Sequence, residues 1–258
     1  MNKTLDERPD DGKPLPVCRS LGAALSPERQ RTNETLARLE ASERPESRRG
    51  RLIVALDLTS SREHSLYQAR IATAAMFDTI KALGTVAVKL VYYRGNDECR
   101  ASRWHSEPDI LSQAMRRLGC ETGPTQIARV LRMALSEQDG VVGLVYVGDH
   151  CEEGSDELIE LARLLGQRPL PLFVFHECAD HDERSVEAKP IFKRMAEASG
   201  GTYVEFKPDS GTVLRELLAS VGAFAAAGAD GVRQVASLET AEAKQLQKRL
   251  LLGPGQEV

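Results

Sequence analysis

The sequence predicts an α/β domain with a doubly wound, mostly parallel central sheet flanked by helices. From residue 50 onward, short apolar runs alternate about six times with segments of helical periodicity. This alternation is typical of a parallel sheet that carries helices on both faces. The runs are apolar at consecutive positions, as in strands that are buried on both faces. Apolar residues make up 41% of the chain and charged residues 28%, a composition that indicates a soluble globular protein.

The first strand is expected over residues 51–58, RLIVALDL, and the first helix over 63–83, where Gly84 supplies a C-terminal cap. The elements after them are expected, in order, as a strand at 85–95, a short strand at 99–104, helices at 108–119 and 125–137, a strand at 140–149, a helix at 155–166, a strand at 169–176, a helix at 185–200, a strand at 201–206 and a helix at 212–228. Ser155 is expected to cap its helix, and Pro190 to kink or start the helix that contains it.

The chain divides into three parts by composition. Residues 1–49 are rich in Arg, Glu, Pro and Ser and can bury little apolar surface, which predicts a partly disordered extension with one possible helix that begins at Ser26. Residues 50–227 form the α/β domain. Residues 228–258 are expected to be a C-terminal helical extension, with a charged helix at 230–251.

Charge and composition exclude several classes of partner. The net charge of −4 gives no basic surface for nucleic acid. The sequence has no apolar run of about eighteen residues, so we expect no membrane span, and the polar N-terminus has no apolar core of a secretory signal. The five cysteines are scattered and form no C-x-x-C pair, which suits reduced thiols. We therefore expect a cytoplasmic protein; the oligomeric state stays open.

Oxygen-bearing side chains gather where the predicted strands end. Asp57, Thr59 and Ser61 follow the first strand at every second position and share one side of an extended segment. Thr125 precedes a helix, and Asp149 ends the strand at 140–149. Ligands of such sheets bind beyond the carboxyl ends of the strands, so these residues are expected to meet. An all-oxygen set without His or Cys favours Mg²⁺ or Mn²⁺ over zinc.

The ordered pattern DLTSS, GPT and VGD resembles the metal-ion-dependent adhesion site of von Willebrand factor type A (VWA) domains. That motif is D-x-S-x-S after the first strand, a Thr before a helix and an Asp after the fourth strand. Asp57, Thr59 and Ser61 match its first part, with Thr59 in place of a Ser, while Thr125 and Asp149 match the others. The resemblance covers about residues 50–227 and implies the Rossmann-like three-layer VWA fold, in which the segment 99–104 is a short antiparallel edge strand.

The resemblance also implies a function. The hydroxyl groups would bind Mg²⁺ directly, the aspartates would bind it directly or through water, and an acidic residue of a partner protein would complete the octahedron. This implies a bacterial, intracellular adaptor that binds proteins and is not an enzyme. The chain departs from the family pattern in the extra methyl group of Thr59, in the stiff Pro124, and in His150, where the family often has Gly.

Other interpretations of the same residues stay open. A metal-dependent hydrolase or phosphatase could use the same cleft, but a haloacid-dehalogenase-like phosphatase needs a second Asp where this chain has Thr59. Nucleotide-binding glycine motifs are absent from the sequence. A metal-free scaffold is a further alternative, as is a purely capping role for Thr125 and Ser61. The segment HECADHDE, residues 176–183, is interpreted as a solvated loop in preference to a zinc site.

Overall fold

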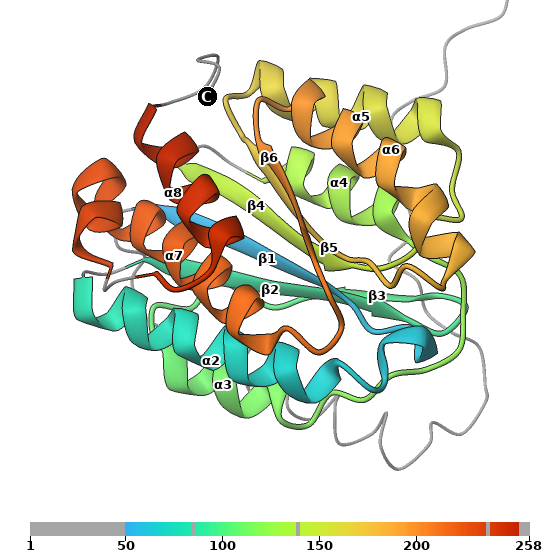
Figure 1. Ribbon diagram of the computed structural model, residues 1–258, viewed down its shortest axis with the longest axis horizontal. Coiled ribbons are helices and arrows are strands. Elements are labelled where there is room, and N and C mark those ends of the chain that lie inside the picture. Colours follow the sequence, from blue (N-terminus) through green and yellow to red (C-terminus); the bar gives the residue numbers. More distant parts are fainter. Residues whose placement is uncertain (1–49, 84–85, 138–139, 236–237, 253–258) are drawn as a thin grey trace, which may run out of the picture.

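The computed structural model describes residues 50–83, 86–137, 140–235 and 238–252 and confirms the predicted three-layer α/β architecture (Figure 1). The described strands are β1 (Arg51–Asp57), β2 (Ala87–Arg94), β3 (Glu98–Ala101), β4 (Val141–Gly148), β5 (Leu172–Glu177) and β6 (Thr202–Phe206). They form one six-stranded sheet in the order β3-β2-β1-β4-β5-β6. All neighbouring strands are parallel except β2 and β3, so the short antiparallel edge strand lies where the sequence predicts it.

Helices cover both faces of the sheet. The described helices are α2 (Leu66–Leu83), α3 (Pro108–Met115), α4 (Ile127–Ser136), α5 (Ser155–Gln167), α6 (Glu183–Ala198), α7 (Gly211–Gln234) and α8 (Ala241–Leu252), together with the 3₁₀ turn η1 (Ser60–Arg62). Helices α2, α3, α7 and α8 share one apolar cluster with the sheet, and α4, α5 and α6 share another (Figure 1). The two clusters are the two cores of a doubly wound fold.

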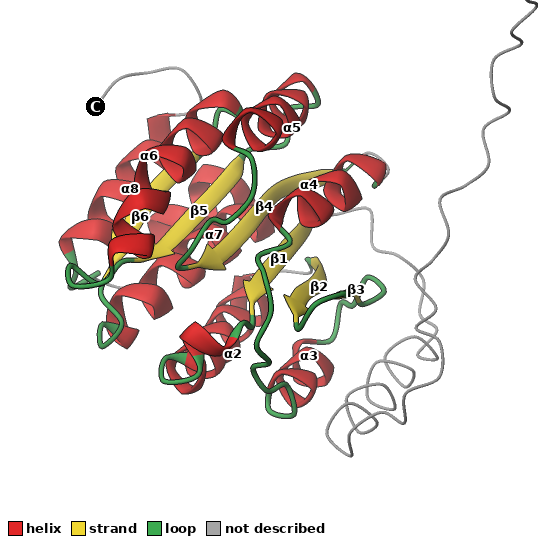
Figure 2. Ribbon diagram, turned by 90° about the vertical axis from the view of Figure 1, so that its right-hand side faces the viewer, coloured by secondary structure: helices red, strands yellow, loops and turns green. Residues whose placement is uncertain are grey.

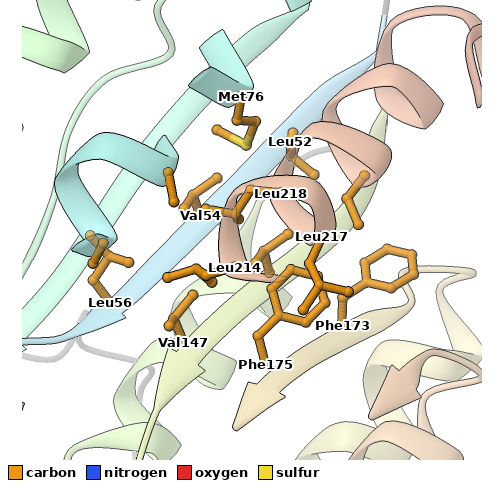
Figure 3. Close-up of a cluster of buried hydrophobic side chains, with 14 of the residues drawn as sticks. Leu52, Val54, Leu56, Met76, Val147, Phe173, Phe175, Leu214, Leu217 and Leu218 are labelled. Atoms are coloured by element: carbon orange, nitrogen blue, oxygen red, sulfur yellow. The ribbon is translucent and has the colours of Figure 1, made fainter. Parts of the chain in front are cut away.

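The central strand β1 shows how the sequence makes two cores. Leu52, Val54 and Leu56 point to the face covered by α2 and α7 (Figure 3), whereas Ile53 and Ala55 belong to the opposite cluster. Because successive side chains of a strand alternate between faces, Asp57 continues the Ile53 and Ala55 side. The last residue of β1 therefore directs its carboxylate to the α4 side of the sheet.

The strand order places the site. The chain runs outward from β1 to β3 and then returns to β4, which lies on the other side of β1. The carboxyl ends of β1 and β4 thus flank the point where the winding reverses, and this is where ligands of open α/β sheets bind. Figure 2 shows the parallel strands ending at one edge, with loops leading on from them.

The C-terminal region differs from the prediction of one helix at 230–251. Helix α7 continues to Gln234 across a kink at Ala227 and Gly228, and α8 is a separate helix. Gly228 has a φ of +61°, a conformation that favours glycine and that breaks the regular helix. Helix α8 buries Ala243 and Leu246 in the cluster that also contains α7. The predicted extension therefore packs on the domain.

The structure also tests the predicted helix start at Ser155 and the predicted effect of Pro190. Gly154 is the N-cap of α5 and Ser155 is its first residue, so the predicted cap is wrong by one position. Pro190 lies inside α6, which begins at Glu183 and not at the proline. Residues 1–49, with the possible helix at Ser26, lie outside the described residues.

Helix α7 bears on the expectation that the chain has no membrane span. By length and composition alone, it is the one helix of the described segments that is long and apolar enough to cross a membrane. However, 56% of its apolar window is buried inside the protein, and it packs along α2 and beneath the sheet (Figure 1). These contacts are those of a core helix.

Candidate metal site

Asp57 lies beneath the site, at the end of β1, and is only 1% exposed. The backbone N–H of Thr59 donates a hydrogen bond to its Oδ1 (2.8 Å), and the Tyr93 hydroxyl donates to its Oδ2 (2.7 Å). The Tyr146 hydroxyl lies 2.8 Å from that of Tyr93, which extends the chain of hydrogen bonds into the core. Burial and the nearby Asp149 carboxylate raise the pKa of Asp57 to about 6. The carboxylate is thus fixed in position, and it is largely ionised at neutral pH.

Thr59 and Ser61 do not lie on one extended segment with Asp57, as the sequence suggested. The strand ends at Asp57, and the chain turns into η1, of which Ser61 is the middle residue. The turn brings the two hydroxyl oxygens to 3.1 Å from each other. Their convergence is therefore due to the 3₁₀ turn and not to strand alternation. Ser61 lies inside this turn, which also rules out the capping role considered for it.

Thr125 is held by the loop that follows β4. Its Oγ1 accepts a hydrogen bond from the Glu152 backbone N–H (3.0 Å), and its own N–H donates to the Glu152 carboxylate (3.3 Å). The N-cap of α4 is Gln126, so Thr125 does not have the capping role that we considered. The first N–H groups of α4, those of Ile127 and Ala128, instead donate to the Glu153 carboxylate.

Asp149 follows β4 and is 6% exposed. Its Oδ1 is buried and has no hydrogen-bond donor among the described residues. Its backbone carbonyl accepts a hydrogen bond from His176 Nε2 (3.0 Å), which fixes the residue. Burial lowers the pKa of His176 to about 4, so this imidazole is neutral at neutral pH. His150, the next residue, is turned to Asp182 at 2.6 Å.

The predicted site residues surround two neighbouring clefts. Thr59, Ser61 and Thr125 line a cleft of about 250 Å³ whose wall also includes Pro124 and His150. Ser61 and Asp149 line a second cleft of about 310 Å³. Ser61 is common to both, and Asp57 lies buried below. The structure thus gathers the hydroxyl groups on one side of Ser61 and the Asp149 carboxylate on the other.

Two charged residues of the site were missed by sequence reasoning. Arg62, the last residue of η1, and Glu177, the last residue of β5, are each only 2% exposed. Arg62 Nη1 lies 3.1 Å from Glu177 Oε2, although the N–H is not aligned for a hydrogen bond. Burial lowers the pKa of Arg62, but the carboxylates of Glu177, Asp149 and Asp57 outweigh it, and the net effect raises that pKa.

The donor set fits a hard divalent cation. A buried carboxylate oxygen without a hydrogen-bond donor is costly, and Asp149 Oδ1 is such an atom. Among the described residues, no group of three or more His, Cys, Asp or Glu side chains could hold a metal ion, so the hydroxyl groups would be needed as ligands. Residues 176–183 are not simply a solvated loop, because His176 and Cys178 are buried.

Replacing Asp57 with Asn is expected to raise the free energy of unfolding of the metal-free protein by about 3 kcal/mol at pH 7, since one pKa unit corresponds to about 1.4 kcal/mol. The pKa of Asp57 is raised from 3.8 to about 6 in the folded state, so its contribution to stability is present below pH 3.8 and is lost as the pH rises through about 6. Urea unfolding from pH 4 to 8 tests this.

The difference in unfolding free energy between the wild type and Asp57→Asn isolates the pH dependence that Asp57 causes. His176 acts in the opposite direction, because its lowered pKa removes stability as the pH falls from 6.5 towards about 4. This effect is the same in both proteins and cancels in their difference. A difference in stability that does not shrink between pH 7 and pH 4 would contradict the assignment of the raised pKa to Asp57.

Gly123 is required for the loop that carries Thr125. A Cβ at this position would lie 2.1 Å from the Gly95 carbonyl oxygen in the turn between β2 and β3. The Gly123→Ala variant is expected to lose about 1–3 kcal/mol of stability and to bind Mg²⁺ more weakly. Gly154→Ala, at the N-cap of α5 in the loop after Asp149, is the control for Mg²⁺ affinity, since a Cβ there meets nothing within 4 Å. Equal effects of the two substitutions on Mg²⁺ affinity would contradict this role.

The sequence matches no known family model and no curated protein. The structure is similar to that of the conserved hypothetical protein BatB from Bacteroides thetaiotaomicron, with 15% sequence identity and a TM-score of 0.53 over 66% of this chain and 95% of that one. A von Willebrand factor type A protein from Catenulispora acidiphila matches with 15% identity and a TM-score of 0.56 over 69% of this chain and 43% of that one. The SpRpn10 VWA domain matches with 12% identity and a TM-score of 0.50 over 67% of this chain and 94% of that one.

The sheet order, the antiparallel edge strand and the two helical layers define a class of doubly wound α/β domain. Together with these structural neighbours, they show that the chain has the von Willebrand factor type A fold. At such low identities the likeness extends to the fold alone, so the site has to be judged on its own residues.

Proposed function

We propose that this domain is a metal-dependent protein-interaction module. A Mg²⁺ or Mn²⁺ ion held by Asp57, Thr59, Ser61, Thr125 and Asp149 would bind an acidic side chain of a partner protein. The ion supplies a positive centre with positions open to an outside carboxylate, since Mg²⁺ prefers octahedral oxygen coordination. The VWA fold supports the coarser part of this proposal, a module that binds proteins.

The observation that carries the proposal is the Asp149 carboxylate. Its Oδ1 is buried without a donor at the reversal point of the sheet, and Ser61 beside it is hydrogen-bonded to Thr59. A divalent cation there would satisfy the oxygen and offset the repulsion between Asp149 and Asp57, which contributes to the raised pKa of Asp57. The cleft of about 250 Å³ beside the hydroxyl groups gives room for one partner side chain.

We propose no enzymatic activity. The hydrolase or phosphatase alternative needs a general acid or base two residues after Asp57, and Thr59 there has its hydroxyl against Ser61. The scattered cysteines, which form no C-x-x-C pair, support a cytoplasmic adaptor, whose partner is distinguished by an accessible Asp or Glu.

The test is affinity capture of partners on the immobilised protein in Mg²⁺ and in chelator, with an Asp57→Ala column as the control. We expect proteins that bind only the wild type and only with metal. Replacing the partner's contacting Asp or Glu with Asn or Gln should then abolish binding. Partners retained equally in chelator would favour the metal-free scaffold instead.

A further inference from the structure

Arg62 is a cation built into the candidate metal site. It is among the largest fully buried side chains of the described residues. Its place is fixed by η1, because its backbone N–H donates to the Thr59 carbonyl (3.1 Å) and its own carbonyl accepts from the Ser65 N–H (3.1 Å). Since Ser61 precedes it directly, the same turn positions Arg62 and a predicted metal ligand.

Three carboxylates at the carboxyl ends of β1, β4 and β5 interact with the Arg62 guanidinium. Glu177 at the end of β5 is its ion-pair partner, at 3.1 Å. Asp149 after β4 and Asp57 at the end of β1 also act on it electrostatically. A buried ion pair contributes little net stability compared with apolar residues of similar volume. Its position beside two predicted metal ligands points to a role in the electrostatics of the site.

We propose that Arg62 and Glu177 set the affinity of the site for divalent cations. The guanidinium lowers that affinity by repelling the ion, and Glu177 limits the effect by pairing with the guanidinium. This inference rests on the proposed metal site but adds residues that lie outside the five predicted ligands. It explains why the site holds a third carboxylate that the motif does not contain.

The charges give a defined set of expectations. Arg62→Met removes the competing cation and leaves three carboxylates, so Mg²⁺ should bind on the order of tenfold more tightly. Glu177→Gln leaves the guanidinium opposed only by Asp57 and Asp149, so Mg²⁺ should bind on the order of tenfold more weakly. The double variant restores the local charge, and its affinity should return to within a few-fold of wild type.

The experiment is titration calorimetry of Mg²⁺ and Mn²⁺ into the full chain and these three variants, with thermal melting to confirm folding. Arg62→Lys keeps the charge and should bind like wild type. Lys89→Met is a control that removes a cation from another ion pair, with Glu137. Lys89 pairs in register with Ile53, far from the end of β1, and its loss should leave the affinity unchanged.

The outcomes separate this inference from the proposed function. Opposite changes in Arg62→Met and Glu177→Gln support it, and unchanged or parallel affinities overturn it while the metal site stands. If Arg62→Met does not fold, the isosteric Glu177→Gln decides alone. If neither the wild type nor Arg62→Met binds either ion, the proposed metal site and the inference both fail. Binding by Arg62→Met alone would support both, because removal of the guanidinium would then have made the site able to bind the ion.

Discussion

Replacing Asp149 with alanine is expected to abolish Mg²⁺ binding, with a loss of affinity on the order of a hundredfold or more, since even residues that only orient metal ligands affect affinity by about 10- to 100-fold. Asp149 supplies the buried oxygen that has no donor, and with it the charge that a divalent ion needs. Asp57→Ala should have the same effect. Thr125→Ala should weaken binding less, because it removes one neutral hydroxyl group.

The fold should survive these substitutions. Asp149→Ala removes a buried oxygen that lacks a donor, and this gain offsets the lost attraction between Asp149 and Arg62. The melting temperature of Asp149→Ala without metal should therefore stay close to that of the wild type. Circular dichroism melts with and without Mg²⁺ check this. Mg²⁺ should raise the melting temperature of the wild type but not those of Asp149→Ala and Asp57→Ala. An aspartate variant that still gains stability from Mg²⁺ would show that the ion binds elsewhere.

Replacing Phe175 with alanine is expected to lower the free energy of unfolding by about 3–5 kcal/mol, the usual cost of removing a buried aromatic ring. Phe175 lies in β5, is fully buried, and faces the apolar cluster around Leu217 of α7 (Figure 3). The cost is high because packed side chains on both sides cannot fully close the cavity. Urea unfolding of wild type and variant gives the value directly.

Tyr67→Ala is the matched control for that prediction. Tyr67 is also aromatic but is 67% exposed on α2, so its loss should change stability by no more than about 0.5 kcal/mol. If the two variants were destabilised alike, the burial of the Phe175 side chain against α7 would not explain the loss of stability.

The sequence predicted the sheet well because each strand is specified locally. RLIVALD and VVGLVYVG are apolar on both faces and are bounded by polar residues, so strands and their carboxyl ends can be located without a structure. The rule that ligands bind at those ends then selected Asp57 and Asp149. The structure places both residues there, and it adds the 3₁₀ turn that brings the Thr59 and Ser61 hydroxyls together.

Features that depend on long-range pairing could not be predicted. Arg62 stands in a polar stretch, SSREHS, where an arginine is normally solvated. Only the neighbouring β5 strand shows that Glu177 meets it. One signal was present, since Glu177 follows an apolar strand as Asp57 does. The hydrogen bonds of the Tyr93 and Tyr146 hydroxyls near Asp57 could not be predicted either, because both tyrosines lie in apolar segments typical of buried strands.

The C-terminal helices show a further limit of local pattern. Gly228 predicted that one helix ends at 228 and the next starts at 230, whereas α7 continues past its kink to Gln234 and α8 begins at Ala241. The Glu216 carboxylate of α7 accepts hydrogen bonds from the N–H groups of Glu239 and Thr240 and so stabilises the start of α8. That contact forms only when the chain folds back on itself.

Titration of the purified protein with Mg²⁺ and Mn²⁺, beside the Asp57→Ala variant, tests the proposed metal site most directly. We predict saturable binding to one site in the wild type and no binding in the variant. Equal binding by both proteins, or binding by neither, would contradict a metal site at the carboxyl ends of β1 and β4.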